Sequence, residues 1–97
     1  MIIRIVKMTF RSDEVTAFQQ LFEERKEQIR NFNGCCHLEL WQDHNHPNTF
    51  FTYSWWQSES HLDEYRRSHF FDDTWTLTKQ KFSAAPQAWT VNQLVKV

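Results

Sequence analysis

Residues 35–56, CCHLELWQDHNHPNTFFTYSWW, contain two strand patterns separated by a turn. Polar and apolar side chains alternate over Cys35–Gln42, while aromatic residues dominate Thr49–Trp56, and both patterns are typical of β-strands. Residues 43–48 between them are a cluster of Asp, Asn, His and Pro, which favours a turn. A connection of six residues between two strands predicts an antiparallel β-hairpin.

The residues before the hairpin predict a strand followed by a helix. Ile2–Phe10 is rich in β-branched residues, which favours a strand. Apolar side chains then recur at spacings of three, four or seven from Val15 to Phe32, and this spacing predicts an amphipathic helix. Ser12 offers a capping oxygen at its start, and Gly34, the only glycine, offers a left-handed residue at its end.

The residues after the hairpin predict a second helical region and a final strand. Ser58 marks a helix start, and apolar residues continue at helical spacing as far as Phe82. The pattern is disturbed at 70–73, so a bent helix and two consecutive helices both remain open. Pro86 ends the region, and Ala88–Val95 has the composition of a strand.

The order β-α-β-β-α-β predicts one α+β, ferredoxin-like domain over residues 1–97. In this fold a four-stranded antiparallel sheet carries both helices on one face. In Thr49–Trp56 large apolar side chains occur both at the positions that face one side of the strand and at those that face the other. The face of the sheet opposite the helices therefore also needs a cover. With only two helical regions available, the expected cover is the sheet of a second copy, which predicts a homodimer.

Composition excludes several classes of protein. The formal net charge is −1 and the basic residues are scattered, so nucleic acid is not an expected partner. No apolar stretch approaches the roughly 20 residues that span a bilayer, and the N-terminus lacks a signal-peptide pattern. We therefore expect a cytoplasmic protein with no membrane partner. Cys35 and Cys36 are adjacent and predict reduced thiols, and a pair of histidines, His44 and His46, lies in a polar turn without the support that a metal site needs.

A set of residues across the second half of the chain follows a known layout. The layout is a strand that ends in Trp, an acidic helix start, a Ser/His-Phe element and a closing strand; its residues are Trp56-Gln57-Ser58-Glu59, Leu62–Phe70, Trp75, Lys79, Phe82, Pro86 and Ala88–Val91. It resembles the antibiotic biosynthesis monooxygenase family, and the likeness extends over the whole chain in order and length. The resemblance implies a dimeric α/β barrel. It also implies a cofactor-independent monooxygenase that oxidises a small hydroxylated aromatic, quinol or polyketide-like compound with O2.

Oxygenation without a cofactor requires a base, donors that stabilise the substrate anion, and a dry aromatic slot. His69 falls in the family's His-Phe element and, at helical spacing, on the same face as Tyr65. We expect His69 as the base and Tyr65 as a hydrogen-bond donor; the alternatives are a histidine that caps a bent helix and a packed tyrosine. His37 beside Glu39 on one strand face is a second candidate base, and a polar sheet edge is the alternative.

Four further residues are candidates for substrate binding. Arg4, in an otherwise apolar strand, either stabilises an anionic substrate or pairs with Glu39, and we favour the ion pair. Trp56 is expected to face the cavity, and Phe71 and Trp75 are candidates for closing it, although core packing is the more common role of such residues.

Two other functions remain open. One is a non-catalytic module that binds a ligand or dimerises. The other is haem binding, since the family includes haem-degrading enzymes, which use an Asn on the first strand and a Trp and a His in the second helix. Here the first strand has no Asn, and Tyr65 and Trp75 stand at the helical positions. Haem degradation is therefore not expected, although His69 could still ligate a haem.

Overall fold

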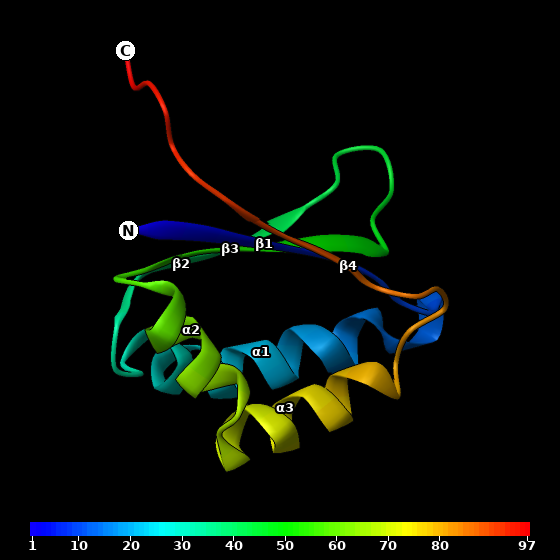
Figure 1. Cartoon of the computed structure of the whole chain (residues 1–97). Coiled ribbons are helices and arrows are strands. Elements are labelled where there is room, and N and C mark those ends of the chain that lie inside the picture. The colour runs from blue at the N-terminus through cyan, green and yellow to red at the C-terminus, as the bar shows by residue number, and fades with distance from the viewer.

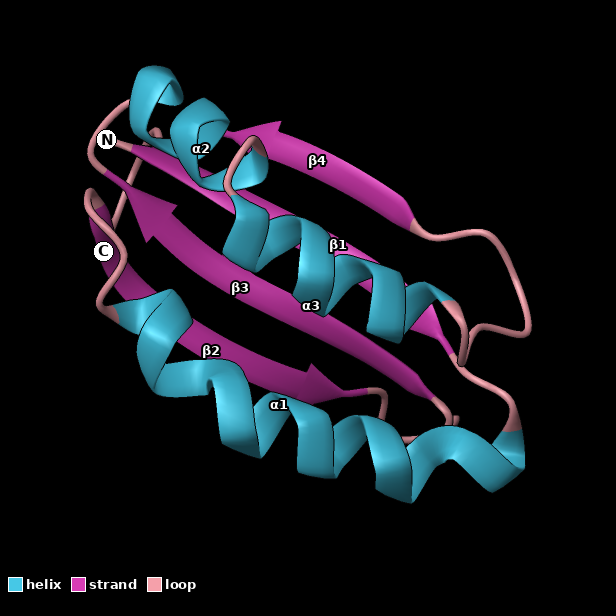
Figure 2. Cartoon of the chain, turned by 90° about the horizontal axis from the view of Figure 1, so that it is seen from below, coloured by secondary structure: helices cyan, strands magenta, loops and turns pink.

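The computed structural model describes residues 1–97 as one antiparallel sheet with all helices on one of its faces (Figures 1 and 2). The elements are β1 (Ile2–Thr9), the short 3₁₀ helix η1 (Ser12–Glu14), α1 (Val15–Arg30), β2 (Cys35–Gln42), β3 (Thr49–Trp56), α2 (Glu59–Arg66), α3 (His69–Lys79) and β4 (Gln87–Val91). The strand order is β2-β3-β1-β4, and all neighbours are antiparallel. The predicted ferredoxin-like fold is confirmed.

The β2–β3 hairpin has the predicted bounds, but β2 contains a bulge that changes the facing of its first residues. The register shifts between Cys35 and His37, so Cys36 is the extra residue. Cys35 therefore pairs with Trp56 and shares its buried, helix-facing side, while Cys36 is only half-buried. Plain alternation along the strand would place Cys36 on the same face as Leu38 and Leu40, but the inserted residue gives that face to Cys35 instead.

The helical region after β3 consists of two consecutive helices. Ser58 caps α2 by accepting a hydrogen bond from the backbone N–H of His61 at 3.3 Å, as predicted. Ser68 caps α3 in the same way and accepts from the N–H of Phe71 at 3.1 Å. The second cap is the physical reason for the break, because its residue is extended and cannot continue α2. None of the helices has the length and apolar character that crossing a membrane requires.

The predicted ends of the first and last strands and the predicted cap of the first helix differ from the structure. β1 ends at Thr9, and Phe10 forms only an isolated bridge with Phe82. Ser12 starts η1 and makes no capping hydrogen bond to α1. β4 ends at Val91 instead of Val95, and in Figure 1 the chain after it leaves the sheet.

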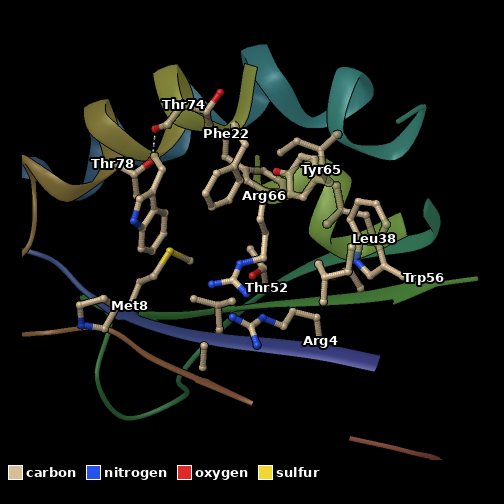
Figure 3. Close-up of a pocket in the computed structure, with 18 of the residues that line it drawn as sticks. Arg4, Met8, Phe22, Leu38, Thr52, Trp56, Tyr65, Arg66, Thr74 and Thr78 are labelled. Atoms are coloured by element: carbon tan, nitrogen blue, oxygen red, sulfur yellow. Dashed lines mark hydrogen bonds between the residues drawn. The ribbon is translucent and has the colours of Figure 1, made fainter. Parts of the chain in front are cut away.

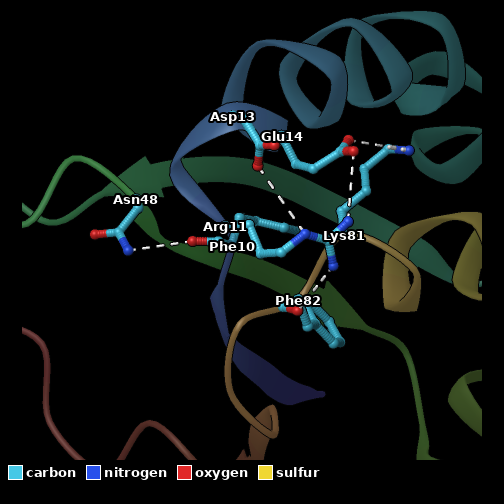
Figure 4. A network of polar contacts seen from close by, with 7 residues as sticks. All are labelled: Phe10, Arg11, Asp13, Glu14, Asn48, Lys81 and Phe82. Carbon is cyan, nitrogen blue, oxygen red and sulfur yellow. Dashed lines mark hydrogen bonds and ion pairs between the residues drawn. The ribbon is translucent and has the colours of Figure 1, made fainter.

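A polar network joins the end of β1 to the connection between α3 and β4 (Figure 4). The backbone N–H of Arg11 donates to the carbonyl of Lys81 at 3.0 Å, and the Arg11 guanidinium donates to the carbonyl of Phe82 at 3.3 Å. Glu14 accepts from Arg11 at 3.4 Å and lies 3.8 Å from the Lys81 ammonium. Residues far apart in sequence are thus fixed where the chain turns back toward the sheet.

The face of the sheet opposite the helices carries five aromatic side chains. They come from three strands and are Trp41, Phe51, Tyr53, Trp55 and Trp89, on one face according to the strand register. Trp41 stacks on Tyr53 with ring centroids 4.6 Å apart, yet Trp41 is 40% and Trp89 44% exposed. We call this surface the open face. The prediction that Thr49–Trp56 carries large apolar groups on both sides is confirmed, because Phe50 and Trp56 are buried on the other side.

Gly34 is the only residue with a positive φ, 89°. It lies between α1 and β2 and not directly at the helix end, because α1 already stops at Arg30. A Cβ at this position would overlap Cβ and Cγ of His61 in α2. Glycine is thus required both by the backbone conformation and by the close approach of α2.

Gly34→Ala should lower the free energy of unfolding by about 2 kcal/mol or more, because left-handed strain of about 1–2 kcal/mol adds to the clash with His61. The shift in the urea midpoint measures the effect, with Asn33→Ala in the same connection as the control. A midpoint unchanged from wild type would contradict the requirement for glycine.

Candidate functional site

A cavity of about 290 Å³ lies between the sheet and the helices (Figure 3). Twenty residues line it, of which twelve are hydrophobic, and they come from all four strands or their ends and from all three α-helices. Its walls include members of both buried core clusters, such as Tyr65 and Phe18. The volume is close to the lower limit of roughly 300–1,000 Å³ for small-molecule sites, which suits a compact ligand.

The cavity exists because of the sequence of side-chain sizes along β3. On the helix-facing side this strand presents Phe50, Thr52, Ser54 and Trp56, so two small residues lie between two large ones. The large rings are each 1% exposed and fill the core at either end. The space above Thr52 and Ser54 is left for the cavity, of which both residues form part of the floor.

Four predicted aromatic residues come together in the cavity wall. The ring of Trp56 stacks on Tyr65 at 4.8 Å, Phe71 meets Tyr65 edge to face at 5.0 Å, and Phe71 stacks on Trp75 at 5.9 Å. The indole N–H of Trp56 donates to the hydroxyl of Ser54 at 3.0 Å, which fixes the ring plane. The result is a continuous aromatic wall against which a flat ligand can pack.

Tyr65 contributes a neutral hydroxyl to this wall. The residue is 9% exposed, and its hydroxyl, which makes no hydrogen bond to another residue of the chain, is not among the fully buried polar atoms and borders the cavity. Burial, with a smaller contribution from Cys35, raises the pKa of Tyr65 well above its ordinary value. Tyr65 therefore stays protonated at neutral pH, and its hydroxyl is able to donate a hydrogen bond.

Two arginines supply the only charges of the lining. Arg4 on β1 donates to the hydroxyl of Thr90 at 3.0 Å, and Arg66 is the last residue of α2. Figure 3 shows both guanidinium groups directed into the same part of the cavity. Burial lowers the pKa of Arg4, the charge of Arg66 lowers it further, and Asp63 acts in the opposite direction. Neither arginine forms an ion pair, and the lining contains no Asp or Glu.

The favoured ion pair between Arg4 and Glu39 was wrong. Arg4 pairs with Ser54 across the strands and faces the helices, whereas Glu39 pairs with Tyr53 on the open face. The sheet separates the two side chains. Which face each strand position occupies depends on the register between strands, which the sequence alone did not give.

The structure does not bring His37 and Glu39 to the cavity. Both lie on the open face, where the imidazole of His37 contacts the Glu39 carboxylate and the indole N–H of Trp41 donates to it at 2.8 Å. The hydrogen bond from His37 and that from Trp41 lower the pKa of Glu39. This arrangement is a polar cluster at the outer edge of the sheet.

The structure also separates His69 from Tyr65. His69 is the exposed first residue of α3, beyond the break that ends α2, and it is not part of the cavity lining. The expected shared helical face assumed one continuous helix. No histidine lines the cavity, so the haem ligand considered from the sequence is not in a position to bind a haem inside it.

Arg66 is the residue that the sequence-based prediction missed. It lies four residues after the buried Leu62 and directly after Tyr65, on the side of α2 that faces the sheet. A charged residue at such a position on an apolar stripe was the available signal.

Comparison with known proteins gives the family. The sequence model described as antibiotic biosynthesis monooxygenase (ABM) matches residues 1–76. The chain belongs to the ABM family. Proteins of the ABM family are typically dimeric. No curated protein matches the sequence.

Solved structures share the ABM fold over nearly the whole chain. A crystal structure of an antibiotic biosynthesis monooxygenase has a TM-score of 0.91 and 17% identity, over 98% of this chain and 100% of that one. A conserved protein from Methanosarcina mazei Go1 has a TM-score of 0.89 and 21% identity, over 97% and 94%. Rv0793 from Mycobacterium tuberculosis has a TM-score of 0.88 and 17% identity, over 98% and 96%. Identities this low show the fold and leave the substrate undefined.

The raised pKa of Tyr65 predicts a specific loss of stability in alkali. In the unfolded chain a tyrosine ionises near pH 10, while the folded chain still holds the proton. The unfolded state then binds fewer protons, so the free energy of unfolding falls as the pH rises above about 10, by up to about 1.4 kcal/mol per unit. Tyr65→Phe should remove this contribution and make the decline shallower.

Urea unfolding between about pH 8 and pH 12 measures the effect. Tyr53→Phe on the open face is the control and should keep the wild-type decline. An equal decline in wild type and Tyr65→Phe would contradict the protonated, buried hydroxyl.

Proposed function

We propose that this ABM protein is a cofactor-independent monooxygenase that uses O2 to oxidise a small hydroxylated aromatic, quinol or polyketide-like compound. The observation that carries the proposal is the aromatic cavity with Arg4, Arg66 and the donor Tyr65 directed into it. An electron-rich ring packs against the wall formed by Trp56 and its neighbours. The two cations stabilise the negative charge that develops when the substrate loses a proton.

The first step is loss of the proton from the substrate hydroxyl. The guanidinium groups of Arg4 and Arg66 lower the pKa of that hydroxyl, because nearby positive charge favours the anion. Arg66 is exposed as well as part of the lining, so solvent reaches the cavity beside it and can accept the proton. His69 at the start of α3 is the alternative acceptor.

The second step is the reaction of the anion with O2, for which the substrate supplies all the electrons. One oxygen atom bonds to a ring carbon, the O–O bond breaks, and the other oxygen leaves as water. For a phenol, a C–H and an O–H bond are lost and the products are a quinone and water, so four electrons pass from substrate to oxygen. The apolar walls keep other water away from the intermediates.

Oxygen uptake by metal-stripped protein on a panel of hydroquinones and anthrones tests the proposal. Uptake should exceed autoxidation, resist chelators, and place one atom of ¹⁸O2 in the product. Arg66→Gln should lower kcat/KM by about tenfold, since a charge-assisted hydrogen bond contributes roughly 1.5–3 kcal/mol. Arg67→Gln, an exposed neighbour outside the lining, is the control.

Two results of this assay would change the assignment. Binding of the compounds without uptake would contradict the oxygenase and leave a non-catalytic ligand-binding module. His69→Ala distinguishes the two routes for the proton: unchanged turnover leaves the proton to solvent, whereas a large loss assigns it to His69.

We also propose that the chain is a homodimer in which the open faces of two sheets cover each other. Support comes from the exposed aromatic residues of this face, especially Trp41 and Trp89, and from the dimers typical of the ABM family. Two copies placed face to face form the predicted α/β barrel. The helix-side cavity of each chain remains separate from this contact.

Trp89→Glu should dissociate the dimer, because it places a charge in the buried contact, while the separate chain stays folded since Trp89 is already 44% exposed. Light scattering at micromolar concentration should give twice the single-chain mass of 11.9 kDa for wild type and the single-chain mass for the variant. Lys79→Glu on α3 is the control. A monomeric wild type would contradict the dimer.

A further inference from the structure

We infer that the substrate carries a permanent carboxylate, bound between Arg4 and Arg66, in addition to the hydroxyl that reacts. The ligand class is therefore a hydroxylated aromatic acid. This inference rests on the proposed function for the reaction and extends it by naming the group that positions the substrate.

The charge of the cavity is unbalanced. Its lining holds two cations and no acid, and its other polar members are neutral. Three of the four arginines outside the cavity have a partner: Arg11 lies 3.4 Å from Glu14, Arg25 lies 2.8 Å from Asp73, and Arg30 donates to a backbone carbonyl at 2.9 Å; the fourth, Arg67, is exposed and lies outside the lining. The two cavity arginines have only one hydrogen bond between them, to a neutral hydroxyl. Two like charges on one cavity repel, and a bound anion removes that repulsion.

A carboxylate fits this pair better than a neutral ligand or a phenolate alone. Its two oxygens match the forked donors of guanidinium groups, so Arg4 and Arg66 can each bind one oxygen. The single charge of the carboxylate balances one arginine. The second positive charge remains to favour ionisation of the hydroxyl, so binding of the carboxylate leaves one arginine to stabilise the reactive anion.

The position of the arginines also sets the orientation of the substrate. Arg4 lies on the strand floor beside Ser54, and Arg66 lies at the end of α2, next to Tyr65. A carboxylate held between them directs the ring toward Trp56 and Tyr65, where the wall is apolar. The small floor residues leave room for an acid of one or two rings.

Calorimetric titration without oxygen tests the inference with matched pairs of probes. The pairs are 2,5-dihydroxybenzoate with hydroquinone, and 1-hydroxy-2-naphthoate with 1-naphthol. We expect at least one acid to bind about tenfold more tightly than its neutral partner, as a charge-assisted contact predicts. Added salt should lower the affinity for the acid and leave the affinity for the neutral compound unchanged.

Arg66→Gln should abolish the preference for the acid, whereas Arg67→Gln should keep it. Arg66 is exposed at a helix end, so its replacement leaves the fold intact even if Arg4→Gln, which loses the bond to Thr90, does not fold. Equal affinity within both pairs, no binding of either acid at millimolar concentration, or a preference that survives in Arg66→Gln would overturn the inference.

This binding experiment separates the two proposals. Acid binding that depends on Arg66 without oxygen uptake would refute the oxygenase and keep the carboxylate site. Oxidation of neutral phenols with no preference for acids would refute the carboxylate site and keep the oxygenase.

Discussion

Strand β3 presents large side chains to both faces of the sheet, and the rest of the structure depends on this constraint. Its two buried rings, Phe50 and Trp56, require helices on one side, and α1, α2 and α3 supply them. On the other side Tyr53 and Trp55 have only sheet neighbours. None of the three α-helices packs on that face. The arrangement therefore supports the proposed second copy as the cover, which would leave the helix side of each chain free for a ligand.

The same strand determines where the ligand cavity lies. Thr52 and Ser54 between the two large rings leave a gap in the core that the helices do not fill. Arg4, whose Cα partner is Ser54, and Arg66, from the end of α2, add positive charge to this gap. Neither arginine has an acidic partner, so their positive charge favours an anionic ligand in this gap. The position and charge of the cavity thus support the proposed binding site.

Much of the fold could be predicted from the sequence because it depends on local patterns. Alternation predicted the bounds of β2, aromatic content predicted those of β3, and Ser58 predicted the start of α2. The site was harder to predict from the sequence, because it depends on the register between strands and on where the helices break. The bulge at Cys36 and the cap at Ser68 each change which residues share a face, and neither follows from periodicity. The aromatic wall was found because of family resemblance and ring content, whereas the role of Arg66 depends on packing of α2 against the sheet.

The central claim is that an aromatic anion binds on the helix side of the sheet. The five tryptophans distinguish binding on the helix side from binding on the open face. Trp56 and Trp75 line the cavity, while Trp41, Trp55 and Trp89 lie on the open face. Titration of ¹⁵N-labelled protein with 1-hydroxy-2-naphthoate, followed by the indole N–H signals in NMR, is the decisive measurement. The account predicts large shifts for Trp56 and Trp75 and small ones for the other three. Shifts confined to Trp41, Trp55 and Trp89 would place the ligand on the open face and contradict it.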